Sequence, residues 1–211
     1  MRKAVANDLS DSAFDFERVV LRAVSEYIGK GRLVSVETSP DDPMKHALDV
    51  LAGIDAWQMF DQNGAMRGIA SRVQWVPDVL PRRWRTFTVR KDRLNGTRTE
   101  QEKMMYRFMH PDAAYTQSAV TIQAYVREPK RKGPLIAAAV IRTRDLCEYM
   151  CTHPPTIAGL VNKQERGRTV IFDAYSWSDL QDAGYDVAIA QGDGSLCVAS
   201  AMGPPGHIVP P

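Results

Sequence analysis

The stretch GIDAWQMFDQNGAMRGIASRVQW, residues 53–75, decides the fold, because two alternating runs of apolar and polar residues flank a turn-prone DQNG at residues 61–64. An Asn-Gly pair between two such runs is typical of the tight turn of a β-hairpin. We therefore expect two antiparallel strands, with Asp55 near the start of the first and Gln74 in the second. A lone acid at the start of such a strand needs a structural or chemical reason.

The bulk composition limits the class of protein. A chain of 211 residues with 44% hydrophobic content can bury one core, so we expect a single domain over residues 1–202 and a Pro- and Gly-rich tail over residues 203–211. No apolar run approaches the roughly 20 residues that span a bilayer, and the N-terminus lacks the apolar region of a signal peptide. Three cysteines, an odd number, favour reduced thiols, and we expect a cytoplasmic protein without a membrane partner.

Periodicity along the chain predicts a mixture of helices and strands. Apolar residues recur at three- and four-residue spacing between Phe14 and Ile28, which indicates an amphipathic helix. Further helices are expected at residues 44–51, 97–109, 145–151 and 176–184, and further strands at residues 32–37, 86–90, 115–126, 135–143, 169–176 and 185–190. Thr97 or Thr99 can cap the helix at residues 97–109, and Ser176 or Ser178 the helix at residues 176–184. The strands at residues 115–126 and 135–143 are expected to be antiparallel neighbours. This order predicts an α+β domain, with a mixed β-sheet flanked by helices.

The order of these elements, together with Gly53-Ile54-Asp55, resembles the core of the restriction-endonuclease-like, or PD-(D/E)XK, nuclease superfamily. In that superfamily a helix precedes a β-meander, an aspartate lies at the start of the second strand, and a Glu-x-Lys type pair lies on the third. Residues 69–74, IASRVQ, occupy the place of this second motif. The resemblance covers about residues 14–142.

The resemblance implies a restriction-endonuclease-like core with C-terminal additions. It also implies a divergent metal-dependent nuclease that hydrolyses the phosphodiester bonds of DNA, in repair, recombination, or mobile-element or defence biology. Adjacent strands of a hairpin bring side chains to within about 5 Å, so a carboxylate and a second ligand can hold one Mg²⁺ ion. Such an ion polarises the phosphate and lowers the pKa of the attacking water.

The site residues follow from this resemblance. It implies Asp55 as a metal ligand and catalytic residue, Gln74 as a neutral oxygen ligand, and Arg72 as the positive charge that lysine usually gives. Neither face of the second strand carries a carboxylate, and Glu26 on the first helix is the implied source of the missing one. We predict that Glu26, Asp55 and Gln74 converge on one pocket, with Arg72 nearby.

Each of these residues also has a purely structural interpretation. Asp55 can cap a loop or pair with Arg72 across the hairpin, Gln74 can be a satisfied polar residue, and Glu26 can be a solvated helix residue. Two hypotheses therefore stay open. The first is a metal-dependent nuclease. The second is a catalytically inactive nuclease-fold module that binds nucleic acid or serves as a subunit of a homo-oligomer or larger complex.

Basic residues gather in two places, although the net charge is only +2. The first group follows the hairpin and contains a tryptophan: Arg82, Arg83, Trp84, Arg85, Arg90 and Lys91. The second group lies within residues 127–132. Such patches neutralise phosphates, and an interleaved tryptophan can stack on an unpaired base, so we expect a nucleic-acid partner, DNA in the first place. A solvated charged surface is the alternative.

A second candidate metal site is the segment CEYMCTH, residues 147–153. Cys147 and Cys151 are four apart and share one side of a helix, and His153 follows directly. Cys197 or His207 can supply a distant fourth zinc ligand. The alternative is a pair of small cysteines on the inner face of an amphipathic helix.

Overall fold

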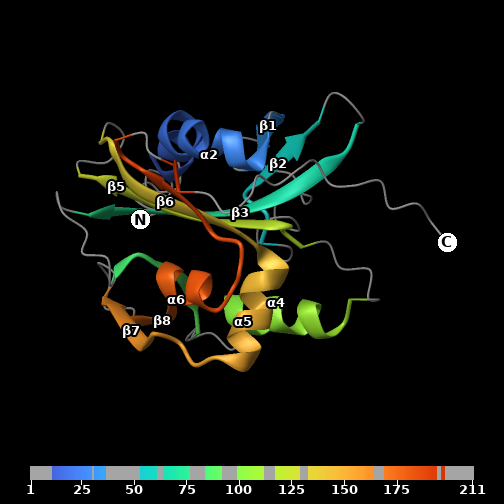
Figure 1. The fold of residues 1–211 in the computed structure, drawn as a ribbon, viewed down its shortest axis with the longest axis vertical. Coiled ribbons are helices and arrows are strands. Elements are labelled where there is room, and N and C mark those ends of the chain that lie inside the picture. The colour runs from blue at the N-terminus through green and yellow to red at the C-terminus, as the bar shows by residue number, and fades with distance from the viewer. Residues whose placement is uncertain are drawn as a thin grey trace.

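The computed structural model describes residues 11–29, 31–36, 53–60, 64–76, 84–91, 99–111, 117–128, 133–163, 169–193 and 196–197. Within these ranges the chain forms a seven-stranded mixed sheet in the order β1-β2-β3-β5-β6-β9-β10 and a three-stranded sheet in the order β4-β8-β7. The first helix covers one face of the large sheet, while the small sheet and the helices α4, α5 and α6 lie on the other (Figure 1). The predicted α+β class is confirmed.

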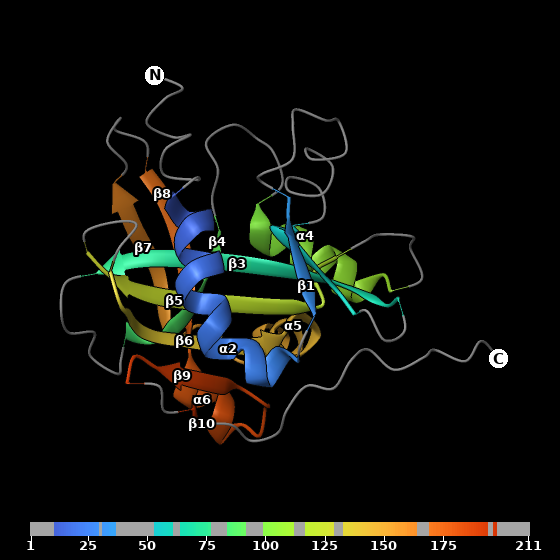
Figure 2. The same cartoon turned by 90° about the horizontal axis from the view of Figure 1, so that it is seen from above.

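The N-terminal helix forms because its apolar side chains make one continuous stripe. It consists of residues 11–15, the π-helical turn η1 (Phe16–Val20) and α2 (Leu21–Ile28). Val20, Val24 and Tyr27 are at most 1% exposed. Seen from above, α2 lies across β5 and β6 (Figure 2). Gly29 follows the helix with a φ of 80°, a backbone conformation that glycine adopts without strain.

The predicted hairpin is confirmed. The strands β1 (Arg32–Ser35), β2 (Ala56–Met59) and β3 (Met66–Val76) form an antiparallel meander. Ala56 lies opposite Ile69, so the strand that begins after Asp55 pairs with the strand that contains Gln74. The Phe60 N–H donates to the Ala65 carbonyl at 2.9 Å and closes the loop between them.

A crossover connection carries the chain from β3 to a parallel neighbour. It contains β4 (Thr86–Arg90) and α4 (Glu100–Met109), and it leads into β5 (Val120–Arg127), whose Val120 lies opposite Ile69 of β3. A parallel pair requires such a long connection, because a tight turn reverses the strand direction. Of the two candidate caps of α4, the structure uses Thr99. Its hydroxyl accepts the Glu102 N–H, while the Glu102 carboxylate accepts the Thr99 N–H.

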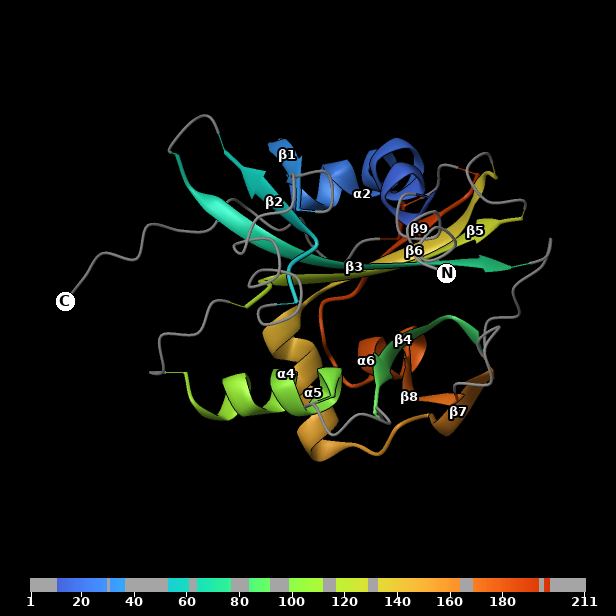
Figure 3. The same cartoon turned by 180° about the vertical axis from the view of Figure 1, so that it is seen from behind.

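The C-terminal elements complete both sheets. They are β6 (Leu135–Arg142), α5 (Thr143–Thr152), β7 (Ile157–Lys163), β8 (Thr169–Ser176), α6 (Trp177–Asp182), β9 (Ala188–Gln191) and β10 (Leu196–Cys197). The predicted antiparallel pairing of β5 and β6 is confirmed. The strand β4 pairs with β8 in the small sheet, which lies beneath the large one beside α4 (Figure 3).

Some expectations fall outside the described residues, namely the helix at residues 44–51 and the tail at residues 203–211. The strand β7 was not expected, because Gly159 interrupts it with a φ of 66° and breaks the alternation of side chains. In the described part of the chain, none of the helices has the length and apolar character needed to cross a membrane.

The hydrophobic core lies on both faces of the large sheet. On β6, Ala138 and Val140 pack under the first helix, whereas Ala137, Ala139 and Ile141 pack towards the small sheet, α5 and α6. A strand that is buried on both faces has a continuous run of apolar residues, which explains the sequence LIAAAVI. The core therefore fixes the far face of the sheet against β4 and α4, where the polar side chains gather.

We expect Val140→Ala to lower the free energy of unfolding by about 2–3 kcal/mol, because it removes two buried methyl groups and leaves a cavity. Val140 is fully buried. The matched control is Val161→Ala, since Val161 is 57% exposed and its loss costs at most about 0.5 kcal/mol. Urea denaturation measures both values, and equal losses at the two positions would contradict this placement of the core.

Candidate functional site

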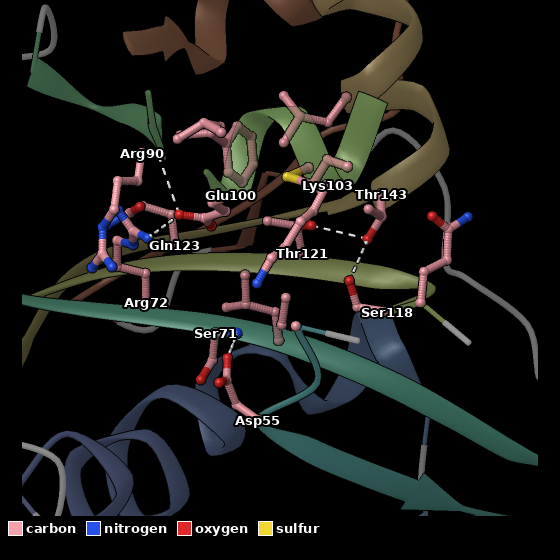
Figure 4. A pocket seen from close by; sticks show the side chains of 18 of the residues that line it. Asp55, Ser71, Arg72, Arg90, Glu100, Lys103, Ser118, Thr121, Gln123 and Thr143 are labelled. Carbon is pink, nitrogen blue, oxygen red and sulfur yellow. Dashed lines mark hydrogen bonds and ion pairs between the residues drawn. The ribbon is translucent and has the colours of Figure 1, made fainter. Parts of the chain in front are cut away.

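A cavity of about 350 Å³ lies between the large sheet, β4 and the helices α4 and α5. Its walls come from β3, β4, α4, β5 and α5, and Figure 4 shows the side chains that face it. The charged residues of the wall are Asp55, Arg72, Arg90, Glu100, Lys103 and Arg107. We call this space the cation-lined cavity, because its wall carries four cations and two acids.

An ion pair joins β3 to α4 at one end of this cavity. Arg72 Nη2 donates to Glu100 Oε2 at 2.6 Å, and the two side chains are 23% and 36% exposed. The same carboxylate oxygen accepts the backbone N–H of Arg90 at 3.2 Å (Figure 4). A charge-assisted pair of this length is stronger than a neutral hydrogen bond. Glu100 therefore holds β3, β4 and α4 together.

A buried amide lies next to this ion pair. Gln123 on β5 is 2% exposed, and its Oε1 accepts the Thr88 hydroxyl at 3.0 Å. Thr88 Oγ1 in turn accepts from Arg72 Nη1 at 3.4 Å. The Gln123 Nε2 is buried and has no hydrogen-bond partner within the described residues. An unsatisfied buried donor costs about 1–3 kcal/mol, so this amide is a ready donor to an acceptor that enters the cavity.

Hydroxyl groups form the opposite end of the cavity, at the start of α5. Thr143 Oγ1 lies 2.9 Å from Thr121 Oγ1 and 3.3 Å from Ser118 Oγ (Figure 4). Each hydroxyl can donate or accept a hydrogen bond. This end of the wall is polar and uncharged, so the positive charge of the cavity comes from α4, β3 and β4.

Two of the cations lie on one face of α4. Lys103 and Arg107 are four residues apart and follow Glu100, so all three point to the same side of the helix. Burial lowers the pKa of the Arg107 guanidinium from its ordinary value. Arginine still carries its charge at neutral pH. The excess of cations in its wall therefore favours an anion in the cavity.

The structure brings together only part of the predicted site. Asp55 and Arg72 line the cation-lined cavity, whereas Gln74 lines a neighbouring one and Glu26 is exposed on α2, over the other face of the sheet. Asp55 Oδ2 accepts the Ser71 N–H at 2.5 Å, at the end of the β2–β3 ladder. Figure 4 shows the Asp55 carboxylate apart from the Arg72–Glu100 pair. Arg72 thus pairs with Glu100 of α4.

Metal ligands do not gather in the described part of the chain. No group of three or more His, Cys, Asp or Glu residues there can hold a metal ion. In the zinc candidate, Cys147 is 1% exposed while Cys151 is exposed. The ring of His153 stacks on Tyr149 with centroids 4.2 Å apart. His207 and the side chain of Cys197 lie outside the described residues.

The residues of the first basic group lie in different places in the structure. Arg90 lines the cation-lined cavity, and Lys91 Nζ pairs with the buried carboxylate of Asp173 at 3.1 Å. Trp84 is 39% exposed at a second cavity, and Arg85 is half-buried beside it in the chain. Arg82 and Arg83 lie outside the described residues, as do residues 129–132 of the second group.

Sequence reasoning missed Glu100, Lys103, Arg107 and Gln123 as site residues. The helix itself was predicted, and the spacing of Glu100, Lys103 and Arg107 places them on one face of it. That spacing was the available signal. Nothing in the local sequence indicates which element this face meets, because α4 and β3 come together only through the crossover connection. Gln123 reads as an ordinary polar residue within a strand.

The chain matches no known protein family, and no curated protein or solved structure is significantly similar to it.

We expect a thiol reagent at pH 8 to modify Cys151 in the native protein and to leave Cys147 unmodified until the protein unfolds. Burial raises the pKa of the Cys147 thiol to about 12, so almost no reactive thiolate forms there at pH 8. Peptide mapping by mass spectrometry measures both sites. Zinc should not protect Cys151, and protection of both cysteines by zinc would favour the zinc site instead.

Proposed function

We propose that this chain is a nucleic-acid-binding protein with a restriction-endonuclease-like core, in which the cation-lined cavity holds a backbone phosphate and metal-dependent cleavage is lost. One observation carries the proposal. Arg72 stands on β3 where the superfamily carries a lysine, and it faces a cavity with four cations and two acids. The proposal includes a cytoplasmic location, which an odd number of cysteines favours because it is typical of reduced thiols.

The order and direction of the elements support the nuclease-like core. The first helix precedes the antiparallel meander β1-β2-β3, and α4 then leads to β5, which runs parallel to β3. The cavity lies beside β3 and β5, on the face that α4 covers. Asp55 lies directly before β2, as the aspartate of the superfamily does. Fold alone does not assign function, so the chemistry of the cavity decides between the two hypotheses.

That chemistry favours binding over cleavage. The donors in the described residues do not fit a Mg²⁺ site, because β3 carries no carboxylate and Glu100 is paired with the Arg72 guanidinium. Asp55 is the other acid of the cavity, and a backbone N–H already occupies one of its oxygens. A phosphate fits better, because it accepts hydrogen bonds from guanidinium, ammonium and amide groups.

Binding is tested by removing two charges from the cavity wall. We expect the double variant Lys103→Gln/Arg107→Gln to bind a labelled DNA strand roughly tenfold more weakly at physiological salt. The slope of log K against log salt should fall by about 0.7 for a single strand, because the cavity holds one phosphate and each lost phosphate contact removes about 0.7. A fluorescence anisotropy titration over a range of salt concentrations measures both effects.

The matched control is Arg18→Gln/Arg22→Gln. These two residues are also four apart on a helix, are exposed, and lie on the opposite side of the large sheet. The control should keep the affinity and the salt slope of the wild type. If the control variant loses as much affinity as the cavity variant, the binding reflects only the overall charge.

Loss of cleavage is tested separately. We expect no cleavage of plasmid or single-stranded DNA by the wild type with Mg²⁺ or Mn²⁺. Products are separated on a gel and compared with those of Asp55→Ala. If the wild type cleaves and Asp55→Ala does not, a metal-dependent nuclease is the correct function and the loss of catalysis is refuted.

A further inference from the structure

A second cavity of about 260 Å³ adjoins the cation-lined cavity. It opens between the large sheet, at Gln74 and Tyr125, and the small sheet, at Thr86, Leu160 and Phe172. Three of its nine lining residues are aromatic: Trp84, Tyr125 and Phe172. We call it the aromatic cavity.

The aromatic cavity has a buried inner end at Tyr125 and a solvent-exposed rim. Tyr125 is 2% exposed, and its hydroxyl donates to the Thr86 carbonyl at 3.0 Å, which fixes the floor. Trp84 and Val161 are 39% and 57% exposed at the rim. A partly exposed indole in a cavity with apolar neighbours suits a flat aromatic ligand, because nucleobases stack on exposed aromatic side chains.

One amide gives this cavity a means to recognise the edge of a ring. Gln74 carries two N–H donors and one carbonyl acceptor. Its Nε2 donates to Thr88 Oγ1 at 3.5 Å, the upper limit for a hydrogen bond. An amide of this kind pairs with the hydrogen-bonding edge of a nucleobase. In this arrangement Gln74 recognises the edge of a base and does not bind a metal ion.

The two cavities are neighbours with a shared wall. Thr88 lines both of them. Phe172 belongs to the aromatic cavity, and the guanidinium carbons of Arg72 and Arg90 lie 5.0 and 5.8 Å from its ring centroid. The cations of one cavity therefore stack on an aromatic wall of the other. A nucleotide has the same arrangement, with a flat base on one side and an anionic phosphate on the other.

We propose that the aromatic cavity binds an unpaired nucleobase of the strand whose phosphate occupies the cation-lined cavity. This inference rests on the proposed function and narrows the ligand class to single-stranded nucleic acid, or to a duplex with an extruded base. A paired base keeps both faces stacked within the duplex and does not enter such a cavity. Trp84 supplies the stacking surface, and Gln74 contacts the edge of the base.

The test compares a labelled single strand with an abasic strand of the same length, which keeps the phosphates and lacks the bases. The wild type should bind the strand with bases at least tenfold more tightly. Trp84→Ala should remove this advantage and leave the affinity for the abasic strand unchanged. Trp84→Phe should restore part of it, because it keeps a stacking ring. Anisotropy titrations give all these constants.

The matched control is Phe14→Ala. Phe14 is 37% exposed, close to the 39% of Trp84, and it lies on the N-terminal helix. This variant should bind both strands as the wild type does. Gln74→Leu should keep the preference for bases over abasic sites and change the preference among the four bases, because it removes the amide and keeps the size of the side chain.

Failure of this inference differs from failure of the proposed function. If the wild type binds both strands equally and Lys103→Gln/Arg107→Gln still reduces the salt slope, the aromatic cavity binds no base and the phosphate site stands. Equal losses for Trp84→Ala on both strands would also overturn it. If the wild type binds neither strand, the proposed function fails and the inference fails with it.

Discussion

The two-sided pairing of β3 is the constraint on which the rest of the structure depends. It is antiparallel to β2 through a short hairpin and parallel to β5 through the crossover that contains β4 and α4. On one face of β3, Ile69 and Val73 pack in the hydrophobic core under α2. The other face meets the elements of the crossover itself. Polar side chains on this second face must therefore find partners from β4, α4 and β5 or remain unsatisfied.

This constraint explains why the polar residues form a network and not a set of surface charges. Arg72 is only 23% exposed, and its guanidinium is shared between Glu100, Thr88 and the ring of Phe172. Gln123 is satisfied at its oxygen and not at its nitrogen. A sequence optimised for stability alone would place apolar residues on both strands, as β6 does. Buried polar groups with such a cost are consistent with the proposed phosphate site, because local rules of stability are broken most often at functional sites.

The sequence predicted the local elements far better than the site. The hairpin and the pairing of β5 with β6 depend on neighbouring residues, and the structure confirms them. The helix caps at Thr99 and Ser176 are each one of two candidates that the sequence offered. The partner of β4 was not predicted, because β8 lies more than seventy residues further along the chain. The cation-lined cavity joins β3, β4, α4 and β5 in the same way. Hydrophobic periodicity identifies such elements but does not indicate which of their faces meet.

The charge of the cation-lined cavity favours the second functional hypothesis, a nucleic-acid-binding module without cleavage. Four cations against two acids leave a net charge of +2 on its wall, at neutral pH. A divalent cation enters such a space against electrostatic repulsion, and it would also have to displace Arg72 from Glu100. The same charge attracts a phosphate. Arg72, Lys103 and the unsatisfied Nε2 of Gln123 can donate hydrogen bonds to it. In the proposed function, Ala70-x-Arg72 takes the place of the Glu-x-Lys pair of the nuclease superfamily, and the same strand would contact a phosphate in place of a metal ion.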